Sequence, residues 1–296
     1  MKLQILADTT LKELKQKAVK LRRDIIEMLY EAGSGHPGGS LSVLDILVLL
    51  YYRVMRIDAA NCQYHDRDRL VLSKGHACPA LYAVLADKGF FPAGELKRLR
   101  KIDSILQGHP DMRKTPGVEM SSGSLGQGLS VANGMALAAR LENSRRRIFV
   151  ILGDGEIQEG QVWEAAMTSA HYRLDNLTAF LDFNGLQIDG WVRDVKSLEP
   201  LLEKWKSFGW HALEVDGHDY RSLMEGVSRA FANKGAPTMI IARTVKGKGV
   251  SFMENQVDWH GKAPGKDEYE KALRELGYGK EGGASYGGDG YQGSLR

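Results

Sequence analysis

The chain has 296 residues, which is long enough for one large domain with a sizeable hydrophobic core or for two small domains. Apolar residues make up 43% of it and charged residues 26%, the composition of an ordinary soluble globular protein. The net charge is only +3, and the single basic run, RRR at 145–147, is typical of a solvated helix end before a strand. These values argue against a nucleic-acid partner.

The features that report on cellular location point to the cytoplasm. The two cysteines, Cys62 and Cys78, have no CxxC partner, which fits a reducing compartment and supports neither a disulfide framework nor a zinc site. The first ten residues, MKLQILADTT, lack the basic-then-apolar order of a signal peptide, and no apolar run is long enough to span a bilayer. We therefore expect a cytoplasmic protein without a membrane partner.

Apolar residues at helical spacing predict two helices at the start of the chain. The first covers 11–31, where leucine, alanine and isoleucine recur every three or four residues. It ends at GSGHPGGS (33–40), a turn that contains four glycines and a proline, and a second apolar helix follows at about 42–54.

The next apolar runs differ from these helices, because they are short and rich in branched residues. They predict five strands, at 69–73, 147–152, 176–183, 211–215 and 238–243. Helical stretches lie between them, for example at 126–143, 159–172, 197–208 and 219–233. Short apolar strands that alternate with helices indicate an α/β fold, namely a doubly wound, mainly parallel sheet with helices on both faces.

The chain divides into one domain and a short tail. All of the predicted strands and helices lie within 1–278, which we assign to a single domain. Residues 279–296, GKEGGASYGGDGYQGSLR, are rich in glycine and have little to bury, so we predict a flexible tail there.

A single acid, Asp154, lies where such a fold keeps its chemistry. It follows the strand at 147–152 with a glycine on either side, and doubly wound sheets bind ligands at the carboxyl ends of their strands. The glycines let backbone amides approach a ligand, and the helix that begins near Glu159 favours an anion such as a diphosphate. A carboxylate beside a phosphate needs a cation between them, and magnesium fits that role. The alternative is that Asp154 only shapes a tight turn.

A second oxygen donor strengthens the metal interpretation. Asn184 follows the next strand, 176–183, in the sequence LDFNGLQIDG, so its amide oxygen is expected at the neighbouring strand end. Two oxygen ligands on adjacent strand ends, with a helix N-terminus between them, predict a site for a metal and a diphosphate. The chain has no GxxxxGK[ST] sequence, which argues against a P-loop.

GDGEIQEGQVWEA followed by DFNGLQIDG resembles the thiamine-diphosphate motif in the form found in transketolases. The resemblance extends from about residue 11 to 265, because further segments occur in the order of that family. These are SGHPGGSLS (34–42), RLVLSKGHACPALYA (69–83), QGHPD (107–111), SSGSLGQGLSVANGMALA (121–138) and TVKGKGVSF…DWHGKAP (244–264). The resemblance implies a thiamine-diphosphate-binding fold, with this chain as its diphosphate-type domain.

Matched position by position, the resemblance implies roles for several residues. Asp154 and Asn184 would bind the metal through side chains and Leu186 through its backbone carbonyl, with Mg²⁺ or another divalent cation such as Ca²⁺ or Mn²⁺ as the ion. Gly155 would give its amide to the diphosphate, and Glu159 would lie near the cofactor at the subunit contact. The other expected cofactor-binding residues are Gly123 and Leu125, near the aminopyrimidine, and Gly153, Ile188 and Lys246. For Lys246, a solvated loop position is the alternative.

Four of the eight histidines are candidates for catalysis. Each lies beside a glycine, where little bulk surrounds the ring, a feature that they share with His218 in DGHD (216–219). An ordinary histidine pKa of about 6.5 allows proton transfer near neutral pH. The four positions also match the transketolase histidines, which implies that they line the funnel around the cofactor's reactive carbon and contact sugar hydroxyls: His36, His76, His109 and His260. We interpret the other four as structural, with the last in a strand-to-helix turn: His65, His171, His211 and His218.

A typical transketolase chain is considerably longer and also has a pyrimidine-binding domain and a C-terminal domain. That further region holds the family's glutamate that protonates the aminopyrimidine and most of the basic residues that bind the sugar phosphate. We therefore expect this chain to be inactive alone and to form an α2β2 heterotetramer with a separate C-terminal transketolase subunit. The complex would transfer a two-carbon ketol unit from a ketose phosphate to an aldose phosphate.

Two other functions stay open. The first is half of another thiamine-diphosphate enzyme, acting on a different sugar or oxoacid, although the glycine-flanked histidines argue against an oxoacid dehydrogenase. The second is a non-catalytic regulatory subunit, but such a subunit has no physical need for Asp154, Asn184 and all four histidines.

Overall fold

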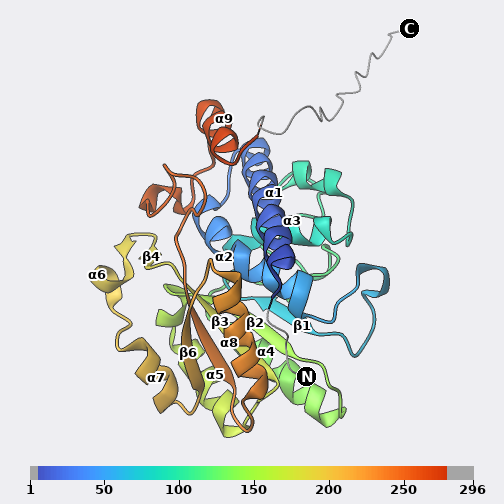
Figure 1. The fold of residues 1–296 in the computed structure, drawn as a ribbon, viewed down its shortest axis with the longest axis vertical. Helices are drawn as coiled ribbons and strands as arrows, with labels where there is room; N and C mark the ends of the chain where they lie inside the picture. Colours follow the sequence, from blue (N-terminus) through green and yellow to red (C-terminus); the bar gives the residue numbers. More distant parts are fainter. Residues whose placement is uncertain (1–5, 279–296) are drawn as a thin grey trace.

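A parallel sheet of five strands forms the centre of the protein (Figure 1). The structure, a computed structural model, describes residues 6–278. The strand order is β1 (Arg69–Leu72), β2 (Ile148–Gly153), β3 (Leu177–Phe183), β7 (Thr238–Arg243) and β6 (His211–Asp216), and all neighbours are parallel. Strand β2 is buried along its whole length, as expected for a sheet that is covered on both faces. The predicted fold class is confirmed.

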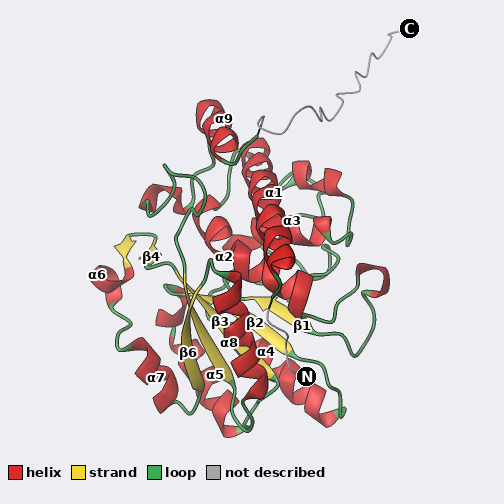
Figure 2. Ribbon diagram, viewed as in Figure 1, coloured by secondary structure: helices red, strands yellow, loops and turns green. Residues whose placement is uncertain are grey.

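Side chains of the strands alternate between two hydrophobic cores, one on each face of the sheet. On β2, Phe149 and Ile151 belong to the first core, whereas Ile148, Val150 and Leu152 belong to the second. The first core is covered by α1 (Asp8–Ala32), α2 (Pro37–Leu49), α3 (Cys78–Asp87), α8 (Tyr220–Ala232) and α9 (Lys266–Glu275). The second is covered by α4 (Gly128–Leu141), α5 (Gly160–His171) and α7 (Leu201–Ser207). Figure 2 shows the strands in the middle of the molecule with these helices around them.

The handedness of the connections explains why α8 lies on the opposite face from α4, α5 and α7. The chain passes from β1 to β2, then to β3 and then to β6, always in the same direction across the sheet. The helices α4, α5 and α7 lie in these connections and cover one face. From β6 the chain steps back to β7, which lies between β3 and β6, so a right-handed crossover has to use the other face. This reversal places α8 against β6 and β7 in the first core.

The longest helix, α1, is amphipathic and buries one side. Its buried side chains recur every three or four residues and include Leu14, Ala18, Leu21, Ile25 and Leu29. The helix ends at Gly33, whose φ of 63° is left-handed and whose N–H donates to carbonyls of the last turn. Within residues 6–278, no helix combines the length and the apolar character needed to cross a membrane.

The predicted strands agree with the structure to within one residue at each end, but two predicted helices begin four or more residues away from their predicted starts. Helix α2 begins at Pro37 instead of about 42, because proline is favourable in the first turn, where its missing N–H costs no helical hydrogen bond. The stretch predicted as one helix at 197–208 contains only α7 from Leu201, since Pro200 disfavours helix in the residue before it. A separate short helix, α6 (Val192–Lys196), precedes it.

Three elements carry too weak a pattern to be predicted. Helix α3 is buried almost all round, so its apolar residues show no helical period, and α9 buries only Ala272 and Leu273. The hairpin of β4 (Leu186–Gln187) and β5 (Gly190–Trp191) has strands of two residues each. The predicted tail at 279–296 lies outside the described residues.

We expect Leu181→Ala, in the centre of β3, to lower the free energy of unfolding by about 2–5 kcal/mol, because it leaves a cavity at a fully buried position. Leu141→Ala removes the same atoms at the end of α4, where the side chain is 85% exposed, and should change stability by less than about 0.5 kcal/mol. Urea unfolding followed by circular dichroism measures both. Equal effects would contradict the placement of β3 between the two cores.

Candidate functional site

A cavity of about 310 Å³ opens where the strands of the sheet end. Its wall comes from the segments directly after β1, β2, β3 and β7, from the beginning of α2, and from longer loops that carry His109, Gly123, Leu125 and His260. Because the carboxyl ends of parallel strands meet at one edge of the sheet, residues far apart in the sequence face a common space. At this edge Gly153, the last residue of β2, pairs with Asp182 in β3.

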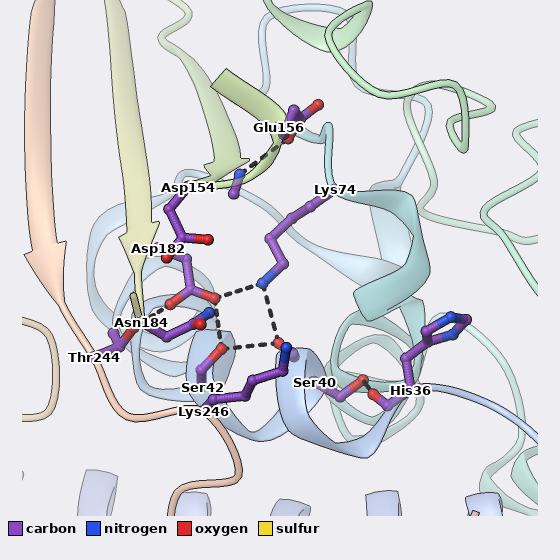
Figure 3. A network of polar contacts seen from close by, with 12 residues as sticks. His36, Ser40, Ser42, Lys74, Asp154, Glu156, Asp182, Asn184, Thr244 and Lys246 are labelled. Carbon is purple, nitrogen blue, oxygen red and sulfur yellow. Dashed lines mark hydrogen bonds and ion pairs between the residues drawn. The ribbon is translucent and has the colours of Figure 1, made fainter. Parts of the chain in front are cut away.

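A buried ion pair joins Lys74, just after β1, to Asp182 in β3 (Figure 3). Lys74 Nζ lies 2.5 Å from Asp182 Oδ2 and also donates to the Gly39 carbonyl in α2 at 3.3 Å. The Ser42 hydroxyl donates to the same carboxylate oxygen at 2.6 Å, and the Thr244 hydroxyl, after β7, donates to the other oxygen. Both charged side chains are at most 2% exposed, so removal of either one leaves an uncompensated buried charge.

Asp154 is held at the end of β2, with both carboxylate oxygens bonded to backbone amides. Oδ1 accepts a hydrogen bond from the Gly155 N–H at 2.8 Å, and Oδ2 accepts one from the Gly185 N–H at 2.6 Å. Burial, together with the nearby charge of Asp182, raises the pKa of this carboxyl to about 6. Both causes disfavour the charged form, so a cation bound against Asp154 would stabilise the carboxylate.

Two further oxygen donors lie beside Asp154. The Oδ1 of Asn184, directly after β3, accepts from the Leu186 N–H at 3.1 Å, and the Leu186 carbonyl accepts from the Lys246 ammonium at 3.3 Å. A carboxylate, an amide and a carbonyl form an oxygen-only set of donors, which suits Mg²⁺ or Ca²⁺ better than zinc. Within residues 6–278, no group of three or more His, Cys, Asp or Glu side chains is placed to hold a metal, which leaves this mixed set as the candidate.

Glu156 fixes the segment 121–128 against the end of β2. One carboxylate oxygen accepts from the Gly126 N–H at 2.9 Å and from the Ser73 hydroxyl, and the other accepts from the Gly153 N–H at 3.0 Å. The carboxyl is buried, and this burial raises its pKa despite the hydrogen bonds that it receives. The segment 121–128 is therefore anchored where it forms part of the cavity wall.

The four glycine-flanked histidines converge on the cavity from four separate segments. The ring centre of His36 lies 5.3 Å from that of His76, 5.6 Å from that of His260 and 6.4 Å from that of His109. Nδ1 of His260 lies 2.9 Å from the ammonium of Lys246, which can only donate, so this nitrogen is the acceptor. Nδ1 of His36 is buried and has no hydrogen-bond partner among the described residues.

These histidines are neutral at physiological pH. Burial lowers the pKa of all four rings, to about 4 for His36 and to about 3 for His260. The positive charges of Arg100, Lys74 and Lys246 act in the same direction. Burial and the neighbouring Lys74 also lower the pKa of Lys246 to about 8. Neutral imidazoles both donate and accept hydrogen bonds, so they can bind hydroxyl groups and transfer protons.

The structure brings together nearly all of the residues that the sequence predicts for the site. Those that line the cavity are His36, His76, His109, Gly123, Leu125, Gly153, Asp154, Gly155, Asn184, Leu186, Ile188, Lys246 and His260. The exception is Glu159, which is exposed just before α5 and packs beside Gly126 without reaching the cavity. Lys246 is only 1% exposed, so the alternative of a solvated loop lysine is wrong.

His218, interpreted as structural, lies in the turn between β6 and α8 and supports the loop that carries Lys246. Its Nε2 accepts from the Val245 N–H at 2.9 Å, so Nδ1 carries the proton and donates to Asp45 at 2.7 Å. Asp45 is buried in α2 and also accepts from Arg22 of α1 at 2.6 Å. Through this ring, the loop after β7 is tied to the two N-terminal helices.

Among the residues of the site that are not predicted from the sequence are Lys74, Glu156, Asp182 and Gln187. Lys74 and Asp182 do carry a signal, because they lie at the ends of predicted strands, where the rule that selects Asp154 also applies. Gln187 lines the cavity, and its buried Oε1 has no partner within the described residues. Glu156 carries no such signal, because its role depends on a segment thirty residues earlier folding onto it.

We expect Lys74→Met to lower the free energy of unfolding by about 3–5 kcal/mol, because Asp182 then remains as an unpaired buried charge. Lys262→Met removes an exposed ion pair with Glu268 and should cost no more than about 1 kcal/mol. Urea unfolding compares the two variants with the wild type. If Lys74→Met is as stable as the control, the pair does not hold the strand ends together.

The lowered pKa of His36 predicts a loss of stability in mild acid. The unfolded chain takes up a proton on this ring at about pH 6.5 and the folded chain only at about pH 4, so stability falls as the pH is lowered between these values. His36→Gln removes this proton uptake, and its stability should fall less steeply than that of the wild type. The raised pKa of Asp154 makes the folded state more stable as the pH falls, but this contribution is the same in the wild type and in His36→Gln. Urea unfolding at half-unit steps of pH gives the free energy of unfolding of each protein as a function of pH. Parallel curves for the wild type and His36→Gln would contradict this prediction.

The sequence matches a known family and two curated relatives. Residues 14–283 match the family described as transketolase, thiamine diphosphate binding domain. The chain is 46% identical over 264 residues to the 6-deoxy-6-sulfo-D-fructose transketolase subunit of Clostridium sp. (strain MSTE9), with 89% of this chain and 96% of the relative covered. It is 43% identical over 265 residues to one of the apulose-4-phosphate transketolase subunits of Actinobacillus succinogenes, with 89% and 96% covered.

The fold matches solved transketolases. The structure of the transketolase from Campylobacter jejuni aligns with a TM-score of 0.85 at 32% identity, and the match covers 90% of this chain but 43% of that chain. The protein thus spans less than half the length of that enzyme and nearly the whole length of the two relatives named as subunits. Because the family match covers most of the chain and the relatives are more than 40% identical, the chain belongs to the transketolase family, in which it forms the thiamine-diphosphate-binding domain.

Proposed function

We propose that the chain is the N-terminal subunit of a two-chain transketolase, which transfers a two-carbon ketol unit from a ketose phosphate to an aldose phosphate. The cavity at the strand ends carries this proposal, because it combines oxygen donors for a cation with four neutral histidines. Figure 3 shows Asp154 and Asn184 on one side and His36 on the other. The relatives named as transketolase subunits support the same type of reaction.

Asp154 and Asn184 would hold a divalent metal ion, Mg²⁺ or another such as Ca²⁺ or Mn²⁺, through side-chain oxygens, and Leu186 would hold it through its carbonyl. The raised pKa of Asp154 supports this role, because a buried carboxylate without a cation is destabilised. The ion would also neutralise a diphosphate next to this carboxylate. When bound, thiamine diphosphate supplies the carbon nucleophile that cleaves the ketose and carries its two-carbon fragment.

The wall beside the oxygen donors fits a large anionic cofactor. A Cβ on Gly155 would lie 3.1 Å from the Cβ of Gln187, so a larger residue would crowd the part of the cavity in which we propose that the diphosphate binds. The side-chain amide of Gln187, whose oxygen has no partner among the described residues, offers a polar contact there. Gly153 continues the narrow wall, and the 64% exposed Ile188 offers an apolar surface to an aromatic ring.

The histidines would bind the sugar and move its protons. A neutral ring can accept a proton from a sugar hydroxyl as a carbon–carbon bond breaks and return it when the new bond forms. Within the described part of the chain, His36 lines the cavity, and its buried Nδ1 has no hydrogen-bond partner. Lys246 donates to Nδ1 of His260, so the proton of that neutral ring is on Nε2, from which it can donate to a substrate oxygen. His76 and His109 complete the ring-lined part of the cavity.

A second subunit would close the cavity. Leu125 and Ile188 line the cavity although they are 37% and 64% exposed, and Glu159 is exposed nearby. Apolar side chains at the rim of a polar site suit coverage by protein. Gly123 and Leu125 line the cavity here and would meet the cofactor's aminopyrimidine. We infer that a separate C-terminal transketolase subunit binds here, which the relatives' names as subunits support. We propose that the complex is an α2β2 heterotetramer.

The choice of sugar is the open part of the function. The relatives are named for 6-deoxy-6-sulfo-D-fructose and for apulose 4-phosphate, which favours an anionic ketose outside the common pentose phosphate pathway as the second candidate. An oxoacid substrate is less well supported, because its acyl chemistry does not need four histidines that bind hydroxyl groups. A regulatory subunit does not account for the buried Asp154 and Lys74.

Purification of the tagged chain from its native cells tests the partner. A co-purifying chain in equal amount, with a pyrimidine-type domain, together with ketol transfer by the complex in the presence of thiamine diphosphate and Mg²⁺, would support the proposal. If the chain is isolated alone, or if the complex transfers no ketol unit, the two-chain transketolase is refuted.

Asp154→Ala in that complex should reduce ketol transfer by more than about 100-fold, because losses of 10-fold to 100-fold already follow from changes outside the first ligands of a metal. Calorimetry should show that the variant no longer binds thiamine diphosphate in a metal-dependent way. Asp194→Ala, at an exposed aspartate of α6, is the matched control and should behave like the wild type. Full activity of Asp154→Ala would rule out this carboxylate as a metal ligand.

A further inference from the structure

His218 lies in the turn between β6 and α8, and its side chain is only 13% exposed. The turn packs directly on the segment after β7, because a Cβ on Gly217 would lie 2.4 Å from Thr244 Cγ2 and 2.9 Å from the Arg243 carbonyl oxygen. The same carbonyl accepts a hydrogen bond from the Gly217 N–H at 2.8 Å. This close approach places the His218 ring beside the first residues of the loop that carries Lys246 into the cavity wall.

Hydrogen bonds on both nitrogens hold the His218 ring in one orientation. Nδ1 donates to Asp45 at 2.7 Å, and Nε2 accepts from the Val245 N–H at 2.9 Å. Asp45 is itself held by the Arg22 guanidinium at 2.6 Å and by the Tyr220 hydroxyl at 2.9 Å. Because these partners come from α1, α2 and α8, the ring connects the Val245 amide to a network that is anchored on three helices.

The Val245 N–H lies where the chain leaves the sheet. Strand β7 ends at Arg243, and the Thr244 N–H still donates to a carbonyl of β3, that of Phe183, at 3.0 Å. The next N–H, that of Val245, donates to the His218 ring instead of to a strand. This hydrogen bond therefore fixes the direction in which the chain enters the loop that begins with Lys246.

The position of Lys246 determines where the proton of the His260 ring lies. Its side chain packs on the beginning of α2, where a Cβ on Gly38 would lie only 2.9 Å from Lys246 Cγ, and the Gly247 N–H donates to the Gly38 carbonyl at 3.0 Å. The ammonium lies 2.9 Å from Nδ1 of His260. Because an ammonium only donates, this nitrogen accepts and the ring proton is on Nε2. Without the contact, a neutral imidazole can carry its proton on either nitrogen.

We propose that His218 is a positioning residue which, through the Val245 amide, holds Lys246 against His260 and so keeps the proton of His260 on Nε2. This rests on the proposed function, in which the Nε2–H of His260 donates to a substrate oxygen. In the other tautomer Nε2 is an acceptor and cannot make that donation. The wrong tautomer of a catalytic histidine is costly even where the geometry of the site is intact.

Nitrogen NMR of the full 296-residue chain, labelled with ¹⁵N-histidine and measured near neutral pH, reports the tautomer of His260 without reference to activity. The main variant is His218→Asn, because the shorter side chain places its amide where Nδ1 lies and reaches Asp45 but not Val245. Glutamine extends its amide to the place of Nε2, so His218→Gln can accept from the Val245 N–H again. His211→Asn, the same substitution at the other end of β6, is the matched control.

In the wild type, in His218→Gln and in the control, the His260 signals should show a proton on Nε2 alone. In His218→Asn the signals of its two ring nitrogens should move toward each other, as expected for a mixture of tautomers. Lys246→Met removes the ammonium without changing His218 and should give the same mixture, so the last link is tested even if His218→Asn does not fold. His260→Gln identifies the signals.

In the two-chain complex with thiamine diphosphate and Mg²⁺, His218→Asn should lower kcat for ketol transfer by about 10-fold to 100-fold, because a catalytic group is no longer held in its productive form. KM should change by less than about 3-fold. His218→Gln should recover most of the lost kcat, and His211→Asn should behave like the wild type.

Three results would overturn this inference and leave the proposed function intact. They are a His260 proton that stays on Nε2 in His218→Asn or in Lys246→Met, a mixture of tautomers with unchanged kcat, and a loss of kcat that His211→Asn shares or that His218→Gln does not recover. A wild-type complex without ketol transfer would overturn the inference together with the proposed function.

Discussion

The ion pair between Lys74 and Asp182 is the contact on which the other parts of the site depend. It joins the end of β1 to β3, and through Gly39, Ser42 and Thr244 it also holds α2 and the loop after β7. Each of these segments contributes a wall of the cavity. Two charges that are almost fully buried are costly unless they stay together with all of their hydrogen bonds, so the pair tolerates little relative movement of the four segments. The positions of Asp154, Asn184 and Lys246 follow from that constraint.

Burial of the titratable groups in the cavity wall determines which of them are charged. Burial raises the pKa of Asp154 and lowers those of His36, His260 and Lys246, so the cavity holds groups that are poorly compensated in their charged forms. Nδ1 of His36 and Oε1 of Gln187 are buried without partners among the described residues. Such groups cost stability when a protein folds, and ligands that supply the missing charges and hydrogen bonds offset that cost. A divalent cation and an anionic cofactor would do this.

Most of the fold could be predicted, because local apolar patterns in this chain report burial directly. The five strands are short and largely apolar, and they are found within one residue of their predicted ends. Prediction failed where burial is uniform or weak. Helix α3 has no polar side to reveal its period, α9 has few buried residues, and the segment before α2 reads as a turn although Pro37 begins a helix. In each case packing against other parts of the chain, not the local pattern, decided the structure.

The sequence by itself determined the α/β sheet and the line of candidate residues at the ends of its strands, since the alternation of apolar strands and helices fixes where each strand stops. Glycine beside His36, His76, His109 and His260 was likewise visible without the fold. Only the tertiary structure decided that the other three rings lie within 6.4 Å of His36, that Lys74 is paired with Asp182, and that Glu159 lies outside the cavity. Those facts depend on distances between segments that are far apart in the chain, and no local pattern encodes such distances.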